Sequence, residues 1–201
     1  MIKKAFTLAE VLLVIAIIGT VAALTIPNLM DNYSEDYTVT QLRKLKNEFD
    51  TAKQKAKLKY DNSSIDAVEI MEFMDVTAHG NNIVFPSETY REANNFELKD
   101  GTLVSTDGSN IYVAIDGIKG KTIGKHIFGF YLYDYDGNEK FAPMGAGDGG
   151  EAHCPDKASN GNLQKKSGCD NISYTNWAVS VGNLDYMKCS GLNWDTKRSC
   201  D

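Results

Sequence analysis

The feature that most limits how this chain can fold is an apolar run near its N-terminus. Lys3 and Lys4 are followed by residues 5–26, in which Glu10 is the single charged residue. As a helix, these 22 residues would span about 33 Å, close to the roughly 30 Å hydrocarbon core of a bilayer. Because the basic residues precede the run and no basic cluster directly follows it, the sequence predicts a single membrane span with a cytoplasmic N-terminus.

Two ordinary interpretations account for only part of this run. A secretory signal peptide cut near residues 21–23 has an apolar core of roughly 7–15 residues, which is shorter than the run found here. Glu10 also lies inside the run, where an acidic charge costs on the order of 2.5–3.5 kcal/mol. A plain membrane anchor explains the length and leaves Glu10 without a role. An ionisable side chain in a membrane helix indicates a functional site and requires a partner.

Residues 3–10 read Lys-Lys-Ala-Phe-Thr-Leu-Ala-Glu and lead directly into the apolar run. This segment resembles the cleavage and methylation motif of type IV pilins and type II secretion pseudopilins, and the match extends through the helix to about residue 30. The resemblance implies that a prepilin peptidase cuts between Ala5 and Phe6 and then methylates the new amine of Phe6. The family usually has Gly before the cut. Ala5 is also small, so we expect cleavage.

The resemblance also implies a partner for Glu10, the terminal amine of Phe6 on a neighbouring subunit. A lone carboxylate in lipid is costly, and pairing it with a cation in a low dielectric recovers much of that cost. A neighbour with the correct stagger would therefore be favoured over a misaligned one. We expect Glu10 to set the register of assembly; the alternative is a tolerated acid without a role.

The next segment predicts a helix that continues beyond the membrane. Pro27 predicts a kink or local melting, and the polar residues 32–36 predict a second irregularity. Apolar residues then recur at steps of three and four, typical of an amphipathic helix: Val39, Leu42, Leu45, Phe49, Ala52, Ala56 and Tyr60. Basic residues flank this stripe, either as a solvated rim or as a strip that meets acids of neighbouring subunits: Arg43, Lys44, Lys46, Lys53, Lys55, Lys57 and Lys59. We expect one long helix over residues 6–60.

The rest of the chain predicts a small head domain. Residues 65–74 predict a short helix capped by Ser63 or Ser64, and residues 75–97 predict an irregular loop. Two hairpins follow, each with a turn signal between its strands: 102–105 with 111–115, and 127–133 with 139–143. Strands that follow a helix in this way favour an α+β fold, in which the long helix packs on a small antiparallel sheet.

Four cysteines lie in the C-terminal part of the chain. An even number in an exported domain indicates disulfides, and four cysteines allow three pairings, among which the sequence does not choose. We expect Cys154 to pair with Cys169 and Cys189 with Cys200, because each pair closes a compact loop. A cysteine-bounded C-terminal loop is also a feature of the family that the N-terminus resembles.

The sequence predicts neither an enzyme nor a cofactor. It contains no phosphate-binding loop, no nucleophile elbow and no Cys-x-x-Cys pair. Asp134, Asp136 and Asn138 form a weak calcium candidate, since the EF-hand pattern requires Gly and Glu where this chain has Glu139 and Gly145. A net charge of −6 argues against general nucleic-acid binding, which depends on neutralising phosphates.

Together these features predict three segments. Residues 1–5 are a leader, residues 6–30 a transmembrane and polymerisation helix, and residues 31–201 a periplasmic or extracellular head. The resemblance implies a structural subunit of the inner membrane and then of a cell-surface filament. Its partners would be other pilin-like subunits, prepilin peptidase, an assembly platform with its ATPase, and inner-membrane lipid. A minor pilin or adhesin, a DNA-uptake pilin, and a membrane-anchored or secreted binding domain remain alternatives.

Overall fold

The computed structural model describes residues 7–60, 65–80, 82–135, 138–145, 156–157, 163–164 and 171–200. The chain divides into two compact units, the first ending at Tyr37 and the second beginning at Thr38. Helix α1, Leu8–Tyr60, continues from the first unit into the second. This confirms the long helix predicted from the sequence. Every residue between its ends is helical, so the local melting predicted at Pro27 is wrong, while the kink there and the irregularity at residues 32–36 stay predictions. Proline removes only its own backbone donor, and the neighbouring hydrogen bonds carry the helix past it.

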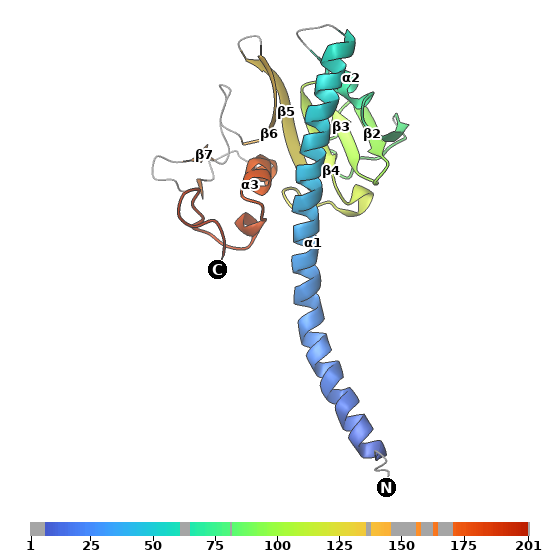
Figure 1. The fold of residues 1–201 in the computed structure, drawn as a ribbon, viewed down its shortest axis with the longest axis vertical. Helices are drawn as coiled ribbons and strands as arrows, with labels where there is room; N and C mark the ends of the chain where they lie inside the picture. The colour runs from blue at the N-terminus through green and yellow to red at the C-terminus, as the bar shows by residue number, and fades with distance from the viewer. Residues whose placement is uncertain are drawn as a thin grey trace. The chain divides into compact units, whose positions relative to one another are not determined.

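The second unit is built on one antiparallel sheet of six strands, in the order β1-β2-β3-β4-β5-β6 (Figure 1). Both predicted hairpins are confirmed, as β3–β4 and β5–β6. The prediction of an irregular loop over residues 75–97 is wrong, because this segment contains β1 and most of β2. The strands are β1 Val76–His79, β2 Asn94–Leu98, β3 Leu103–Thr106, β4 Asn110–Ala114, β5 Ile127–Tyr135 and β6 Asn138–Pro143.

The β3–β4 turn shows why the hairpin signal is reliable here. The side chain of Asp107 accepts hydrogen bonds from the backbone N–H groups of Ser109 and Asn110, at 2.9 and 2.7 Å. Gly108, which lies between Asp107 and Ser109, has a φ of +107°, which residues with a Cβ rarely adopt. These contacts fix the reversal of the chain and therefore the register, which pairs Val104 with Val113.

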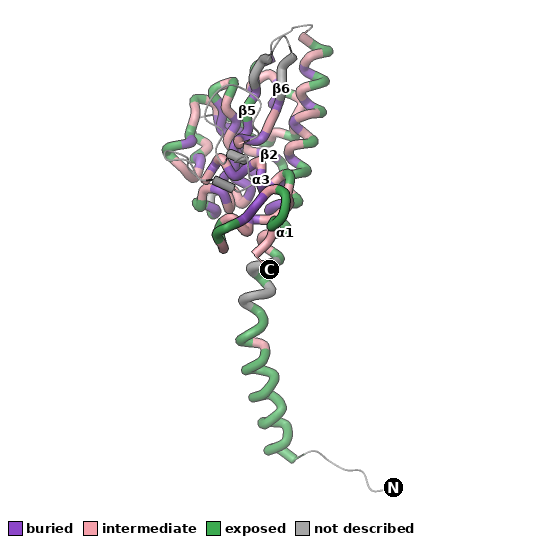
Figure 2. Tube along the Cα trace, turned by 90° about the vertical axis from the view of Figure 1, so that its left-hand side faces the viewer, coloured by how far each residue is buried: buried purple, intermediate pink, exposed green. Residues whose placement is uncertain are grey.

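The main core lies between one face of the sheet and the part of α1 within the second unit (Figures 1 and 2). The predicted apolar stripe of α1 is buried from Val39 to Ala56. Phe49 is fully buried and its ring stacks on that of Phe141, with centroids 5.2 Å apart. Burying a phenylalanine of this kind stabilises the fold by about 1.5–3 kcal/mol. The stripe therefore fixes which face of the helix meets the sheet.

A short helix, α2, covers Ala67–Met71 and begins at a cap that was not predicted. The cap residue is Asp66, whose carboxylate accepts from the backbone N–H of Val68 at 2.8 Å. The carboxylate of Glu69 accepts in return from the N–H of Asp66 at 3.0 Å. This reciprocal pair is a capping box, so the prediction of Ser63 or Ser64 as the cap is wrong.

The opposite face of the sheet carries a second, smaller core. Phe85 and Tyr90, from the segment between β1 and β2, pack there with Leu103, Ala114 and Ile127 of the strands. The C-terminal segment forms the helix α3, Thr175–Ser180, which lies against β5 and β6. Shorter elements complete the order: η1 Gly117–Lys119, η2 Asn171–Tyr174 and η3 Asp185–Met187. Strands β7 Asp156–Lys157 and β8 Leu163–Gln164 pair with each other.

Candidate functional site

The first candidate site is the N-terminal part of α1. Within the described residues, Leu8–Ile26 is the one helical segment long and apolar enough to cross a membrane. None of this segment is buried, and Figure 2 colours nearly all of it as exposed. Leu8 and Leu24 are each 77% exposed. Such a surface requires lipid or other apolar helices around it, which is consistent with single-pass membrane anchoring.

The predicted assembly acid, Glu10, lies in the first turn of α1 and contacts Thr7. Its carboxylate accepts from the backbone N–H of Thr7 at 2.8 Å and from the Thr7 hydroxyl at 2.9 Å. The Thr7 hydroxyl accepts in turn from the N–H of Glu10 at 3.3 Å. Thr7 and Glu10 thus form a capping box at the start of the helix. This capping role was not predicted, although Thr-x-x-Glu before an apolar run is its usual signal. Ala5 and Phe6 lie outside the described residues.

This geometry gives the Glu10 carboxylate a partner within its own chain. A helix N-terminus carries partial positive charge, so an acid in the first turn is favoured there. Both donors from Thr7 are neutral groups. A hydrogen bond to a charged amine is roughly twice as strong as one to a neutral donor. The Glu10 carboxylate is therefore satisfied by neutral donors of its own chain.

The basic residues that flank the α1 stripe divide into two groups. Several are paired within the second unit: Lys46 with Asp50 at 2.7 Å, Lys59 with Glu72, and Arg43 with the carbonyl of Val179 at 2.8 Å. The Lys59 ammonium holds the pKa of the Glu72 carboxyl below its usual value. Lys55 differs, because none of the described residues forms a hydrogen bond or ion pair with its side chain. Some of the basic residues that were predicted to form a solvated rim therefore bind groups of the head domain.

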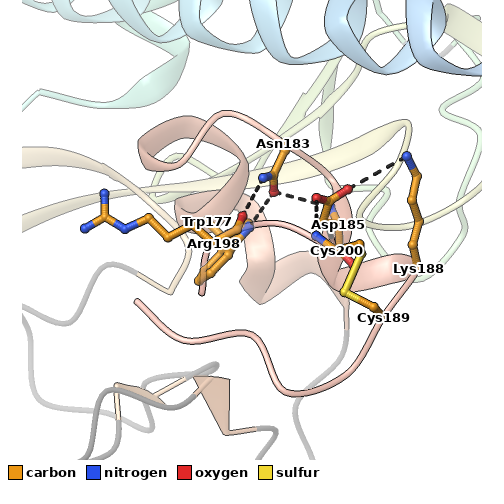
Figure 3. Close-up of polar contacts among 7 residues, drawn as sticks. All are labelled: Trp177, Asn183, Asp185, Lys188, Cys189, Arg198 and Cys200. Carbon is orange, nitrogen blue, oxygen red and sulfur yellow. Dashed lines mark hydrogen bonds and ion pairs between the residues drawn. A yellow bond between two sulfur atoms is a disulfide. The ribbon is translucent and has the colours of Figure 1, made fainter. Parts of the chain in front are cut away.

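The second candidate site is the C-terminal loop closed by Cys189 and Cys200 (Figure 3). Their disulfide confirms one of the two predicted pairings, and the Cα atoms are 5.8 Å apart. Asp185 holds the same loop in a second way, since its carboxylate accepts from the N–H of Cys200 at 3.0 Å. Its carbonyl also accepts from the N–H of Cys189 at 3.0 Å. Cys154 and Cys169 lie outside the described residues.

Asn183 joins this loop to the domain. Its side-chain oxygen accepts from the indole N–H of Trp177 at 2.8 Å, and its amide donates to the carbonyl of Arg198 at 2.6 Å (Figure 3). The Trp177 ring is fully buried and meets Trp194 of the loop edge to face, with centroids 4.6 Å apart. No sequence motif marks Asn183. The loop is therefore anchored by aromatic packing and polar contacts as well as by the disulfide.

The calcium candidate falls outside what the structure describes: Asp136 is not included, and neither are the side chains of Asp134 and Asn138. Among the described residues, no group of three or more His, Cys, Asp or Glu side chains is placed to hold a metal ion.

Comparisons of the chain with protein families, with curated proteins and with solved structures find no match.

Proposed function

We propose that this chain is a structural subunit of a type IV pilus or a type II secretion pseudopilus. In this proposal a prepilin peptidase removes residues 1–5, and the mature chain begins at Phe6. Residues 6–30 first hold the subunit in the inner membrane and then pack with the same helix of other subunits. One observation carries the proposal: an acid, Glu10, lies in the first turn of a long helix whose apolar segment Leu8–Ile26 has no buried residue, and it follows Phe6 by four residues.

The head domain supports the same proposal. Its core is a helical stripe laid on an antiparallel sheet, and its last segment is a loop closed by the Cys189–Cys200 disulfide. A domain of this kind gives each subunit a folded body outside the membrane. The exposed side chains of Leu8–Ile26 remain available for contacts between subunits. Packing of these helices would supply the main driving force, through van der Waals contacts between closely fitted side chains.

Glu10 would act as the register device through an exchange of partners. Before assembly its carboxylate accepts from Thr7 of its own chain. During assembly the cationic amine of a neighbour's Phe6 would replace these neutral donors and form a stronger, charge-assisted bond. Only one stagger between adjacent helices places the amine at the carboxylate, so other alignments leave the acid without a cation.

The first experiment measures the N-terminus of the chain purified from membranes of cells that contain a prepilin peptidase. Mass spectrometry should find a mature chain that begins with N-methylated Phe6. An intact Met1, or a start near Leu24, would contradict processing as a pilin and favour the membrane-anchored or secreted binding domain. A peptidase-deficient strain serves as the control and should yield the uncut chain.

The second experiment tests the register role with two variants, Glu10→Ala and Glu10→Gln. Both should be cut at the same bond as the parent chain, and both should lose most of the filament recovered by shearing. Glutamine keeps the size and hydrogen-bonding capacity of the side chain and removes only its charge. Normal filament yield from Glu10→Gln would therefore refute the electrostatic argument, even if the alanine variant failed.

A further inference from the structure

A groove of about 700 Å³ lies beside α1 in the second unit. One of its walls is a single face of the helix, formed by Lys44, Glu48, Thr51 and Lys55. From Lys44 to Lys55 the helix rises about 16 Å at roughly 1.5 Å per residue. We call this feature the α1 groove. It is long enough for about five residues of extended chain at roughly 3.3 Å each.

The other side of the α1 groove combines an apolar floor with a charged rim. Phe73, Met74 and Leu98 provide the apolar surface. Phe73 and Met74 are only partly buried, so they keep surface that a further apolar side chain could cover. The rim beside them consists of Asp75, Lys99 and Asp100, from the ends of strands β1 and β2.

The charges of the α1 groove are unevenly satisfied. Lys44 lies 3.5 Å from the Glu48 carboxylate and 3.9 Å from that of Asp100, so one cation meets two anions. In contrast, no described residue pairs with the side chains of Lys55 or Lys99. The groove as a whole holds three cations and three acids, so its attraction for a carboxylate is local to Lys55 and Lys99. The groove therefore favours an occupant with an apolar side chain and a nearby carboxylate.

The same chain offers such a segment on the opposite face of its sheet. Residues 82–89, the 82–89 loop, belong to the connection between β1 and β2. Phe85 in this loop and Tyr90 just beyond it are anchored in the second core. Val84 is 60% exposed, so its apolar surface is open to a partner. Glu88 is also exposed, and no described residue pairs with its carboxylate.

We propose that the 82–89 loop of one subunit docks in the α1 groove of the next. Val84 would cover the floor formed by Phe73 and Met74, and Glu88 would meet Lys55 and Lys99. This inference rests on the proposed function, because it assigns a contact between heads within the filament. The two surfaces lie on opposite faces of the sheet, so the contact is heterologous. A heterologous contact that does not close into a ring builds an open helical array.

The experiment is a charge exchange in the full-length chain, with sheared filament yield as the readout. Lys55→Glu and Glu88→Lys should each lower the yield several-fold, because each brings like charges together in the docked pair. The double variant restores opposite charges and should recover most of the yield. Lys121→Glu, an equal charge change at an exposed residue outside the groove, should leave the yield unchanged. Circular dichroism of each detergent-solubilised variant checks that the head remains folded.

A second measurement identifies the contact directly. A photo-reactive phenylalanine analogue at Val84 should cross-link, in filaments, to a peptide of another subunit that contains Phe73 or Met74. The proposal is overturned if the double variant assembles no better than the single ones, or if the cross-link falls elsewhere. The mass of the mature chain is measured for every variant. Loss of the Phe6 start in the parent chain would count against the proposed function, whereas a failed charge exchange with normal processing would count against the groove alone.

Discussion

At the scale of single residues, Gly182 shows how one backbone position holds a long-range contact. It has a φ of +91°, and a Cβ there would lie 2.5 Å from the Arg43 guanidinium. That guanidinium donates to the carbonyls of Val179 and Ser180, at 2.8 and 3.4 Å, where α3 ends. The absence of a side chain at Gly182 thus lets α1 cap the C-terminus of α3.

We expect Gly182→Ala to destabilise the head more than its backbone strain alone would. A left-handed conformation costs an L-residue roughly 1–2 kcal/mol, and displacing Arg43 adds the loss of its hydrogen bonds. Gly191→Ala is the matched control, because its φ is +75° and nothing lies within 4 Å of the added Cβ. Urea unfolding should rank the native chain first, Gly191→Ala second and Gly182→Ala last. Equal losses in the two variants would show that the Arg43 contact contributes nothing.

His126 provides a test by pH. Its Nε2 lies 3.5 Å from an Asp116 carboxylate oxygen, and its Nδ1 accepts from the backbone N–H of Thr122 at 3.3 Å. An acceptor nitrogen carries no proton, so the structure holds the neutral ring. Burial lowers the pKa of His126 below its usual value, Asp116 partly opposes this, and nearby Lys125 lowers the pKa further.

The unfolded chain takes up a proton on this histidine near pH 6.5, and the folded chain does so only at lower pH. Lowering the pH therefore destabilises the folded state. The free energy of unfolding should be constant with respect to this group above pH 6.5. It should then fall as the pH is lowered through that value, until the folded state is also protonated. Urea unfolding between pH 8 and 5.5 measures this slope. In His126→Gln the slope should be smaller; an unchanged slope would exclude His126 as its source.

At the scale of elements, the docking of α3 on β5 depends on the hydroxyl of Thr175. It accepts from the backbone N–H of Gly129 at 2.9 Å and donates to the carbonyl of Ile172 at 2.6 Å. The residue is fully buried. We expect Thr175→Val, which keeps the shape, to lower the free energy of unfolding by about 1–3 kcal/mol, since it leaves a buried N–H unpaired. Thr175→Ser keeps the hydroxyl and should lose less; calorimetry that ranks serine below valine would contradict this account.

Elements that carry a local signal were predictable from the sequence. The β3–β4 and β5–β6 hairpins have turn residues between alternating apolar strands, and the α1 stripe repeats with a helical period. Strand β1 has no such signal, because Thr77, Ala78 and His79 are all exposed and no face selects apolar residues. It forms because β2 offers a partner, which is a non-local cause. The Asp66 cap was readable from Glu69 three residues later, and was missed in favour of the nearer serines.

At the scale of the whole molecule, the candidate site also contains residues that a local sequence pattern marks and residues that no local pattern marks. Glu10 was found from the sequence because one acid interrupts an apolar run, and the C-terminal loop was found because two cysteines bound it. Asn183 and Arg43 were not found, since their roles depend on residues far away in the sequence: Arg198 for the first and Val179 for the second. The α1 groove likewise combines one face of α1 with the segment after α2 and the end of β2, which no single segment predicts.

The division of the chain at Tyr37 predicts that its two units lose structure under different conditions. In detergent, the backbone hydrogen bonds of Leu8–Ile26 are shielded from water and do not depend on the head core. Removing the disulfide with Cys189→Ser/Cys200→Ser should lower the free energy of unfolding of the head by about 2–4 kcal/mol, by freeing the unfolded chain. The contacts of Asp185 with the loop backbone should keep the native fold populated in the absence of denaturant.

Two spectral regions separate these units in one urea titration. Near-ultraviolet circular dichroism reports the Trp177–Trp194 pair, and far-ultraviolet circular dichroism reports helix. In the cysteine variant the near-ultraviolet transition should move to lower urea, while a large part of the helical signal persists beyond it. Ser199→Ala lies beside Cys200 and leaves the disulfide intact, so its transition should match that of the native chain. If the helical and aromatic signals vanish together in every variant, the membrane helix and the head form a single cooperative unit, and Leu8–Ile26 depends on the head for its structure.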